Sequence, residues 1–62
     1  MKWNYEIYTI ADKDDHELGK ADIIDFERLL PLAMFDVVMG YGRNSDFKME
    51  VVTNGRVYKV WR

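Results

Sequence analysis

The chain has 62 residues, of which 48% are hydrophobic and 32% are charged, with a formal net charge of −2 and no cysteine. This length permits one domain, residues 1–62, which hides only about 60% of the surface that the unfolded chain exposes. Disulfides and cysteine-based zinc sites are excluded, and a single histidine excludes a histidine cluster. Of the usual ways to stabilise a small fold, oligomerisation remains.

The sequence indicates a cytoplasmic protein that does not cross a membrane. The lack of cysteine fits a reducing compartment. Residues 1–6 contain neither an uninterrupted apolar segment nor a cleavage site of a signal peptide. The apolar run at residues 29–39 is shorter than the ~20 residues that span a bilayer.

Residues 3–10 are rich in aromatic and β-branched side chains and predict a strand. Alternation places one set of side chains on one face (Trp3, Tyr5, Ile7) and a second set on the other (Asn4, Glu6, Tyr8). Residues 12–15 predict a turn, because aspartate side chains accept hydrogen bonds from nearby backbone groups. Residues 17–21 can return as a second strand, which Gly19 weakens.

A helical pattern begins at Asp22, a suitable N-cap residue. Its apolar residues recur at spacings of three and four, as on one face of a helix: Ile23, Phe26, Leu30, Ala33 and Val37. Pro31 disfavours helical geometry at Leu30, so the helix either kinks or divides there, and division is favoured. Gly40 and Gly42 end the helical region.

The segment from Leu29 to Met39 is apolar on all sides, with Asp36 as its one charged residue. Such a helix must be covered on every side. A chain of this length offers little material to do so, and we therefore expect a homodimer. The expected interface is made by this segment or by the outer face of the C-terminal hairpin, and its candidate residues are Met34, Phe35, Val38, Met39, Val52 and Val57.

The C-terminal residues predict a β-hairpin around Asn54-Gly55, a pair that suits a two-residue type I′ turn. This turn sets the register from Thr53 opposite Arg56 to Lys48 opposite Trp61. One face of the hairpin is then apolar (Phe47, Met49, Val51, Tyr58, Val60), while Glu50 and Lys59 face each other on the other side. The expected fold is a small α+β domain with an antiparallel sheet, in ββαββ or βααββ order.

The charges are unevenly distributed along the chain. Residues 1–36 carry nine acidic and four basic residues, whereas residues 37–62 carry two acidic and five basic residues. We expect the two halves to attract each other within the fold or the dimer.

No residue pattern indicates catalysis, a cofactor or a metal. Ser45, the only serine, and His16 lie in separate predicted turns, so no nucleophile has a positioned base. Counted from Asp12 as a calcium loop, the required glycine is Glu17 and the bidentate glutamate is Ile23. The acidic turn is therefore interpreted as solvated, and the protein as no enzyme.

The remaining function is contact with another macromolecule. A rigid small fold with aromatic anchors suits a protein-binding module, such as an inhibitor or modulator of a host macromolecule of the kind that viruses or mobile elements encode. The acidic first half favours a protein partner with a basic surface. The predicted partner-binding residues are Asp12, Asp14, Asp15, Glu17, Asp36, Tyr58 and Trp61.

The alternative function is binding of single-stranded nucleic acid by the basic, aromatic hairpin. Trp61 could stack on a base while cations contact phosphates. The cations of this second hypothesis are Lys48, Arg56, Lys59 and Arg62. The acidic balance of the chain and the position of Lys59 opposite Glu50 weaken it.

Overall fold

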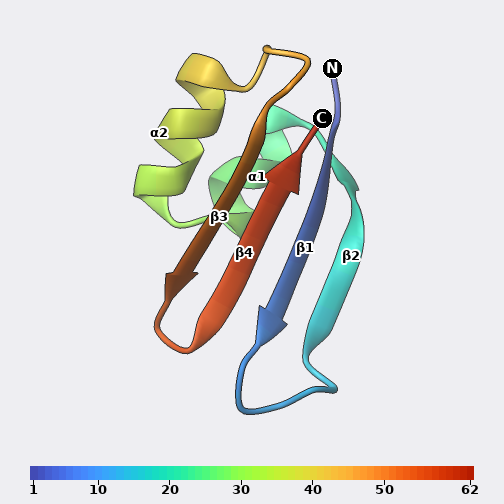
Figure 1. Cartoon of the computed structure of the whole chain (residues 1–62), viewed down its shortest axis with the longest axis vertical. Helices are drawn as coiled ribbons and strands as arrows, with labels where there is room; N and C mark the ends of the chain where they lie inside the picture. The colour runs from blue at the N-terminus through green and yellow to red at the C-terminus, as the bar shows by residue number, and fades with distance from the viewer.

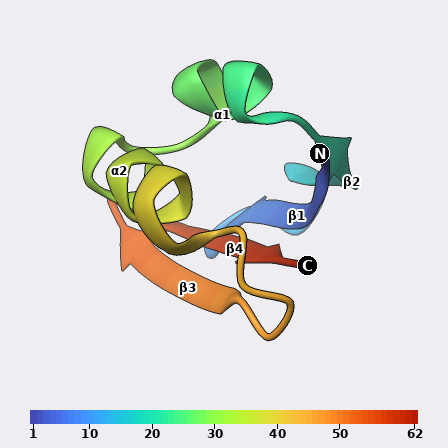
Figure 2. The ribbon, with the colours of Figure 1, turned by 90° about the horizontal axis from the view of Figure 1, so that it is seen from above.

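The computed structural model describes all 62 residues. Its elements are β1 (Trp3–Thr9), β2 (His16–Ala21), α1 (Ile23–Leu29), α2 (Leu32–Tyr41), β3 (Lys48–Thr53) and β4 (Arg56–Trp61). The strands form one antiparallel sheet in the order β2-β1-β4-β3 (Figure 1). Both helices lie on the same side of that sheet (Figure 2). The predicted α+β class, with a hairpin, a helical region and a second hairpin in that order, is confirmed.

The C-terminal hairpin has the predicted turn and register. Asn54 and Gly55 have φ angles of 53° and 74°, the left-handed values that a type I′ turn requires. The pairing runs from Thr53 opposite Arg56 to Lys48 opposite Trp61. The predicted apolar face of this hairpin packs against the core under the helices.

The N-terminal hairpin forms as well, with β2 antiparallel to β1 and Tyr5 opposite Gly19. A Cβ atom on Gly19 would lie 3.3 Å from Cε1 and the hydroxyl oxygen of Tyr5. The Tyr5 ring therefore lies across the backbone of β2, which is a common reason for glycine in a strand. Gly19 gives the ring room to reach Glu17.

The helical region is divided at Pro31, as favoured from the sequence. Asp22 caps α1, since its Oδ1 accepts from the N–H of Ile23 at 2.7 Å and its own N–H donates to Asp25 at 3.3 Å. Leu30 is extended, with φ −108° and ψ 152°, as a residue before proline tends to be. Pro31 stands at the N-cap of α2, one residue before its first turn.

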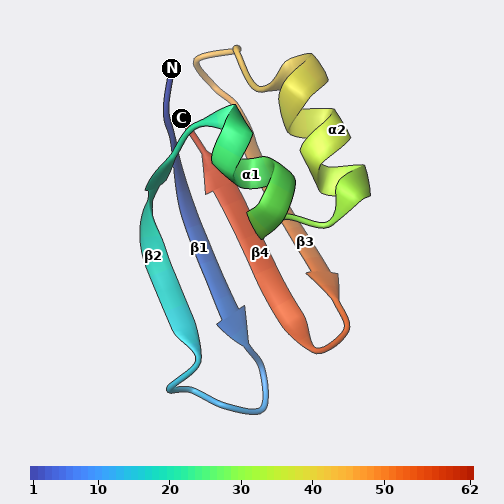
Figure 3. The ribbon, with the colours of Figure 1, turned by 180° about the vertical axis from the view of Figure 1, so that it is seen from behind.

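The core lies between the two helices and the sheet (Figure 3). Its most enclosed side chains are Phe26, Met34, Val38 and Val60. The ring of Phe26 lies 5.8 Å from the ring of Trp3 and 6.0 Å from that of Tyr5. Burial of this aromatic cluster is the main source of stability available to a fold without cross-links.

The apolar stripe predicted through Ala33 and Val37 is wrong for α2. Ala33 is exposed, and the buried residues of α2 are Met34, Phe35 and Val38. The prediction assumed one continuous helical phase, whereas the break between α1 and α2 lets the second helix rotate independently.

One copy covers the apolar segment only in part, since Leu32 on α2 remains 74% exposed. Four of the six residues predicted for the dimer interface are buried within the single chain: Met34, Phe35, Val38 and Val57. Met39 and Val52 are 58% and 56% exposed. They lie on opposite layers of the molecule, in α2 and on the side of the sheet away from the helices, which are the two alternative surfaces expected from the sequence.

The end of α2 is fixed to β1 by a buried hydrogen bond. The indole Nε1 of Trp3 donates to the carbonyl oxygen of Gly42 at 2.8 Å. A Cβ atom on Gly42 would clash with the carbonyl oxygen of Val38 and lie 3.0 Å from the Trp3 nitrogen. Glycine is required here by this close approach and not by the backbone conformation, since a φ of −67° is available to any residue.

We predict that Gly42→Ala lowers the free energy of unfolding by about 1–3 kcal/mol, because the clash displaces the partner of a buried donor. The matched control is Gly40→Ala, which meets nothing within 4 Å and lies inside α2. It should raise stability by about 0.5–1 kcal/mol through helix propensity. Denaturant unfolding followed by tryptophan fluorescence measures both, and an equal effect of the two variants would contradict this account.

Candidate functional site

One face of the sheet has no helix over it, and Figure 1 looks onto this face. Side chains alternate along each strand, so every second residue points to that side. We call it the uncovered face, and its strand residues are Asn4, Glu6, Tyr8, His16, Leu18, Lys20, Lys48, Glu50, Val52, Val57, Lys59 and Trp61.

Apolar and aromatic side chains run across the uncovered face. Leu18 on β2 is 67% exposed, and Val52 on β3 is exposed as well. Tyr8 on β1 and Trp61 on β4 are half-buried on the two central strands. Val57 is buried between its register partners Tyr8 and Val52. The face therefore offers contact area on all four strands.

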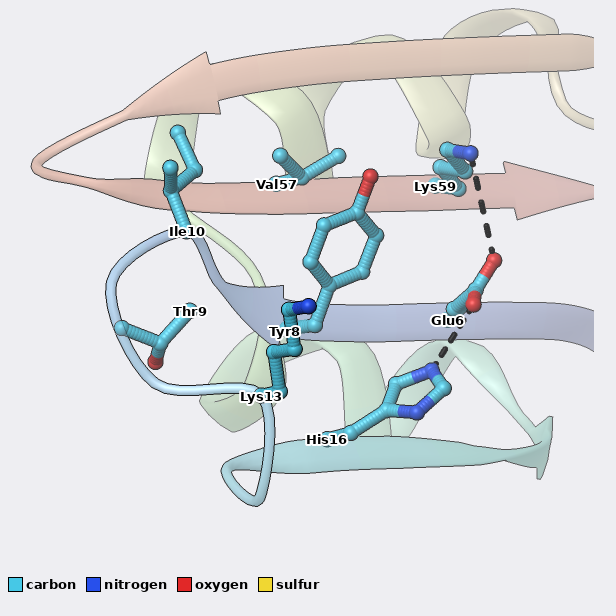
Figure 4. Close-up of a pocket in the computed structure, with 8 residues that line it drawn as sticks. All are labelled: Glu6, Tyr8, Thr9, Ile10, Lys13, His16, Val57 and Lys59. Carbon is cyan, nitrogen blue, oxygen red and sulfur yellow. Dashed lines mark hydrogen bonds and ion pairs between the residues drawn. The ribbon is translucent and has the colours of Figure 1, made fainter.

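Glu6 contacts charged or polar side chains on both neighbouring strands of the face (Figure 4). Its Oε2 lies 2.7 Å from Nε2 of His16 on β2, and its Oε1 lies 4.0 Å from Nζ of Lys59 on β4. The carboxylate thus links the three adjacent strands β2, β1 and β4. Glu50 faces Lys59 in the register as predicted, but the ion pair that Lys59 forms is with Glu6.

Tyr8 is positioned by two neighbours in the same region. Its ring meets the His16 ring edge-on at 5.7 Å, and Nζ of Lys59 lies 5.7 Å from its centroid. These contacts hold an aromatic ring in one orientation on the face, which lowers the entropy that a binding partner must remove.

Two open hollows adjoin at Glu6 and Lys59, which line both. The first, of about 530 Å³, is lined by Glu6, Tyr8, Thr9, Ile10, Lys13, His16, Val57 and Lys59 (Figure 4). The second, of about 430 Å³, is lined by Glu6, Ser45, Asp46, Phe47, Lys48, Lys59, Trp61 and Arg62. Together they form a trough across the uncovered face.

Two aspartates of the acidic turn predicted to bind a partner accept internal hydrogen bonds. Asp15 accepts from Thr9 at 2.6 Å and from Arg56 at 3.1 Å, and Asp12 accepts from the N–H of Asp14 at 3.1 Å. Glu17 lies on the helix side of β2, not with the uncovered face. All four acidic residues are exposed, and most of their acceptor sites remain open to solvent.

Glu17 accepts from the hydroxyl of Tyr5 at 2.6 Å. This hydrogen bond raises the pKa of Tyr5, and burial together with the negative charges of Glu17 and Asp25 adds to the effect. The pair ties β2 to β1 on the side of the core, which is a structural role.

The other predicted partner-binding residues are dispersed. Asp36 is exposed on α2, in the helical layer, and Tyr58 is half-buried against the core. Trp61 alone lies on the uncovered face. Sequence reasoning missed Leu18 and His16 as residues of the uncovered face, although the alternation of residues 3–10 and 16–21 carried that information.

The basic residues of the nucleic-acid hypothesis divide into two groups. Lys48 and Lys59 line the second hollow together with Trp61, as that hypothesis requires. The guanidinium of Arg62 lies instead 5.7 Å from the ring centroid of Trp3 and donates to the carbonyl oxygen of Gly42 at 3.5 Å. Arg56 does not join them, because it lies on the helix side of β4 and its guanidinium forms an ion pair with Asp15.

Comparison of the chain with protein-family models, with curated protein sequences and with solved structures gives no match. Neither helix has the length and apolarity of a membrane span. The structure brings together no group of three or more side chains that could hold a metal ion.

We predict that the hydrogen bond of Tyr5 makes stability fall at alkaline pH. Above about pH 10 an unfolded tyrosine loses its proton, whereas Tyr5 in the fold keeps it because its pKa is raised. The folded state then binds more protons, so the free energy of unfolding decreases as pH rises. Tyr5→Phe should remove this decrease at alkaline pH. It should also lower the free energy of unfolding by about 1–2 kcal/mol at pH 7.

Thermal unfolding between pH 7 and 11 measures the effect. The matched control is Tyr41→Phe, since Tyr41 is 73% exposed and lies outside the Tyr5–Glu17 hydrogen bond. A pH profile that is identical for the wild type and Tyr5→Phe would contradict the role given to this hydrogen bond.

Proposed function

We propose that this chain is a non-enzymatic protein-binding module that contacts its partner through the uncovered face. Its role is that of a small inhibitor or modulator of a host macromolecule in the cytoplasm, acting as a homodimer. The observation that supports this most is the combination of exposed Leu18 with oriented Tyr8 and Trp61 on one rigid sheet. Aromatic anchors surrounded by smaller contacts are typical of binding surfaces.

Rigidity of the anchors favours this function. Tyr8 and Trp61 lie on β1 and β4, the two central strands, which are hydrogen-bonded on both sides. Tyr8 is also held by His16 and Lys59. Little conformational entropy is lost when such side chains meet a partner.

The charges of the uncovered face change the partner that we expect. The face carries three lysines (Lys20, Lys48, Lys59) and two glutamates (Glu6, Glu50). A uniformly basic partner would suit the acidic turn, which lies apart from the aromatic anchors of the uncovered face. A protein surface of mixed charge with an apolar centre fits the uncovered face better.

We predict that Leu18→Glu and Trp61→Ala each weaken partner binding by about tenfold or more, the effect of truncating an anchor residue. The matched controls lie in the helical layer: Ile24→Glu and Tyr41→Ala, at residues 77% and 73% exposed. Affinity capture from a host extract identifies the partner, and titration with the purified partner measures the dissociation constant. Circular dichroism verifies that each variant folds.

Equal weakening by the face variants and the helical-layer variants would contradict this placement of the binding surface. Failure to recover any partner that binds the wild-type chain would contradict the binding function itself.

Single-stranded nucleic acid is the second candidate, because Lys48 and Lys59 line the second hollow together with Trp61. Glu6 and Asp46 line the same hollow, so few of these cations are unopposed. Affinity from counterion release depends on the number of unopposed cations, and this favours the protein partner.

We therefore predict that an oligothymidylate leaves tryptophan fluorescence unchanged at low salt. Trp3 is buried, so Trp61 is the tryptophan that could report stacking. Quenching at low salt that is lost at moderate salt, and absent in Trp61→Phe, would instead support the nucleic-acid function.

A further inference from the structure

The outer edge of β3 carries a row of unpaired backbone groups. In a two-residue hairpin the residues that flank the turn form a hydrogen-bonded pair, and such pairs then alternate along the ladder. The N–H of Arg62 donates to the carbonyl of Phe47 at 3.2 Å, which continues this alternation beyond the strand. The N–H and C=O groups of Lys48, Glu50 and Val52 therefore point away from β4.

These outward groups have no partner within the chain. β3 is the last strand of the sheet on its side. None of the backbone hydrogen bonds outside the helices and strands involves Lys48, Glu50 or Val52, and no side chain bonds to their backbone. An unpaired edge of this kind is a template for another strand.

The opposite edge, β2, is less suited to pairing. Gly19 lies in its middle, and glycine weakens a strand. β3 contains neither glycine nor proline and ends in Val51, Val52 and Thr53, which favour extended structure.

We infer that β3 pairs antiparallel with β3 of a second copy, with Met49 opposite Met49, to form one continuous sheet of eight strands. This inference rests on the homodimer of the proposed function and identifies its interface. A two-fold axis perpendicular to the sheet keeps helix-side residues opposite helix-side residues, so the pairing can centre on Met49, Glu50 or Val51.

Charge complementarity selects among these three registers. Centred on Glu50, the two Glu50 side chains would face each other and repel. Centred on Val51, Glu50 would face Val52 and no opposite charges would meet. Centred on Met49, Lys48 of each copy faces Glu50 of the other, which gives two attractive pairs on the uncovered face.

The same register matches apolar residues on the helix side of the sheet. Phe47 of each copy faces Val51 of the other, and Met49 faces its own counterpart. All three side chains are half-buried at the margin of the core, beside α2 (Figure 2). Pairing would cover their remaining exposed area and join the two cores.

The test uses charge reversal at the two residues that face each other. Lys48→Glu alone places two glutamates opposite each other, and Glu50→Lys alone places two lysines opposite each other. Each single variant should raise the dimer dissociation constant by about tenfold or more in analytical ultracentrifugation. The double variant Lys48→Glu/Glu50→Lys restores the complementary pairs and should dimerise as the wild type does.

An equimolar mixture of the two single variants should form heterodimers, because each supplies the charges that the other lacks. The matched control is Lys20→Glu, the same charge reversal on the uncovered face but at the β2 edge. It should leave the dissociation constant unchanged. Hydrogen exchange at the amides of Lys48 and Glu50 should slow as the wild-type concentration rises.

Two results would overturn the inference, and they are distinguishable. A wild-type dimer that both single variants leave intact, or that the double variant does not restore, would place the interface elsewhere while the homodimer stands. A wild-type monomer at all accessible concentrations would overturn both the edge pairing and the homodimer, without affecting the partner-binding test at Leu18 and Trp61.

Discussion

The fold depends on the burial of two short apolar helix faces against one side of the sheet. The extended backbone of Leu30 before Pro31 separates the helices, so that each presents its own apolar residues. Phe26 from α1 and Met34 from α2 become almost fully enclosed. With the helical material of the chain used on one side, the other side of the sheet has no cover. The free surface of the molecule is a consequence of how its core is filled.

The charge asymmetry of the sequence has a structural role. Two ion pairs join an acidic residue of the first half to a basic residue of the second: Asp15 with Arg56, and Glu6 with Lys59. The expected attraction between the halves is thus confirmed. Exposed ion pairs contribute little stability; these two connect β4 to the turn before β2 and to β1.

Features that depend only on neighbouring residues in the chain could be predicted from the sequence. The Asn54-Gly55 turn set a complete register, and Asp22 and Pro31 set the helix boundaries, because each acts on neighbouring residues. The rotation of α2 could not be predicted, since a helix that is apolar on all sides gives no preferred phase. The site could not be assembled either. The partners of Glu6 are 10 and 53 residues away in the chain, and only the sheet order brings them together.

The uncovered face and the β3 edge can act at the same time. Edge pairing uses backbone groups that point within the plane of the sheet, whereas the uncovered face points perpendicular to it. A dimer joined at β3 would present two uncovered faces on one side of an extended sheet, with a Trp61 from each copy. Two linked faces raise the effective concentration for a second contact. A small binding face of a 62-residue chain would then gain avidity toward a repeated or symmetric partner without any further side chain.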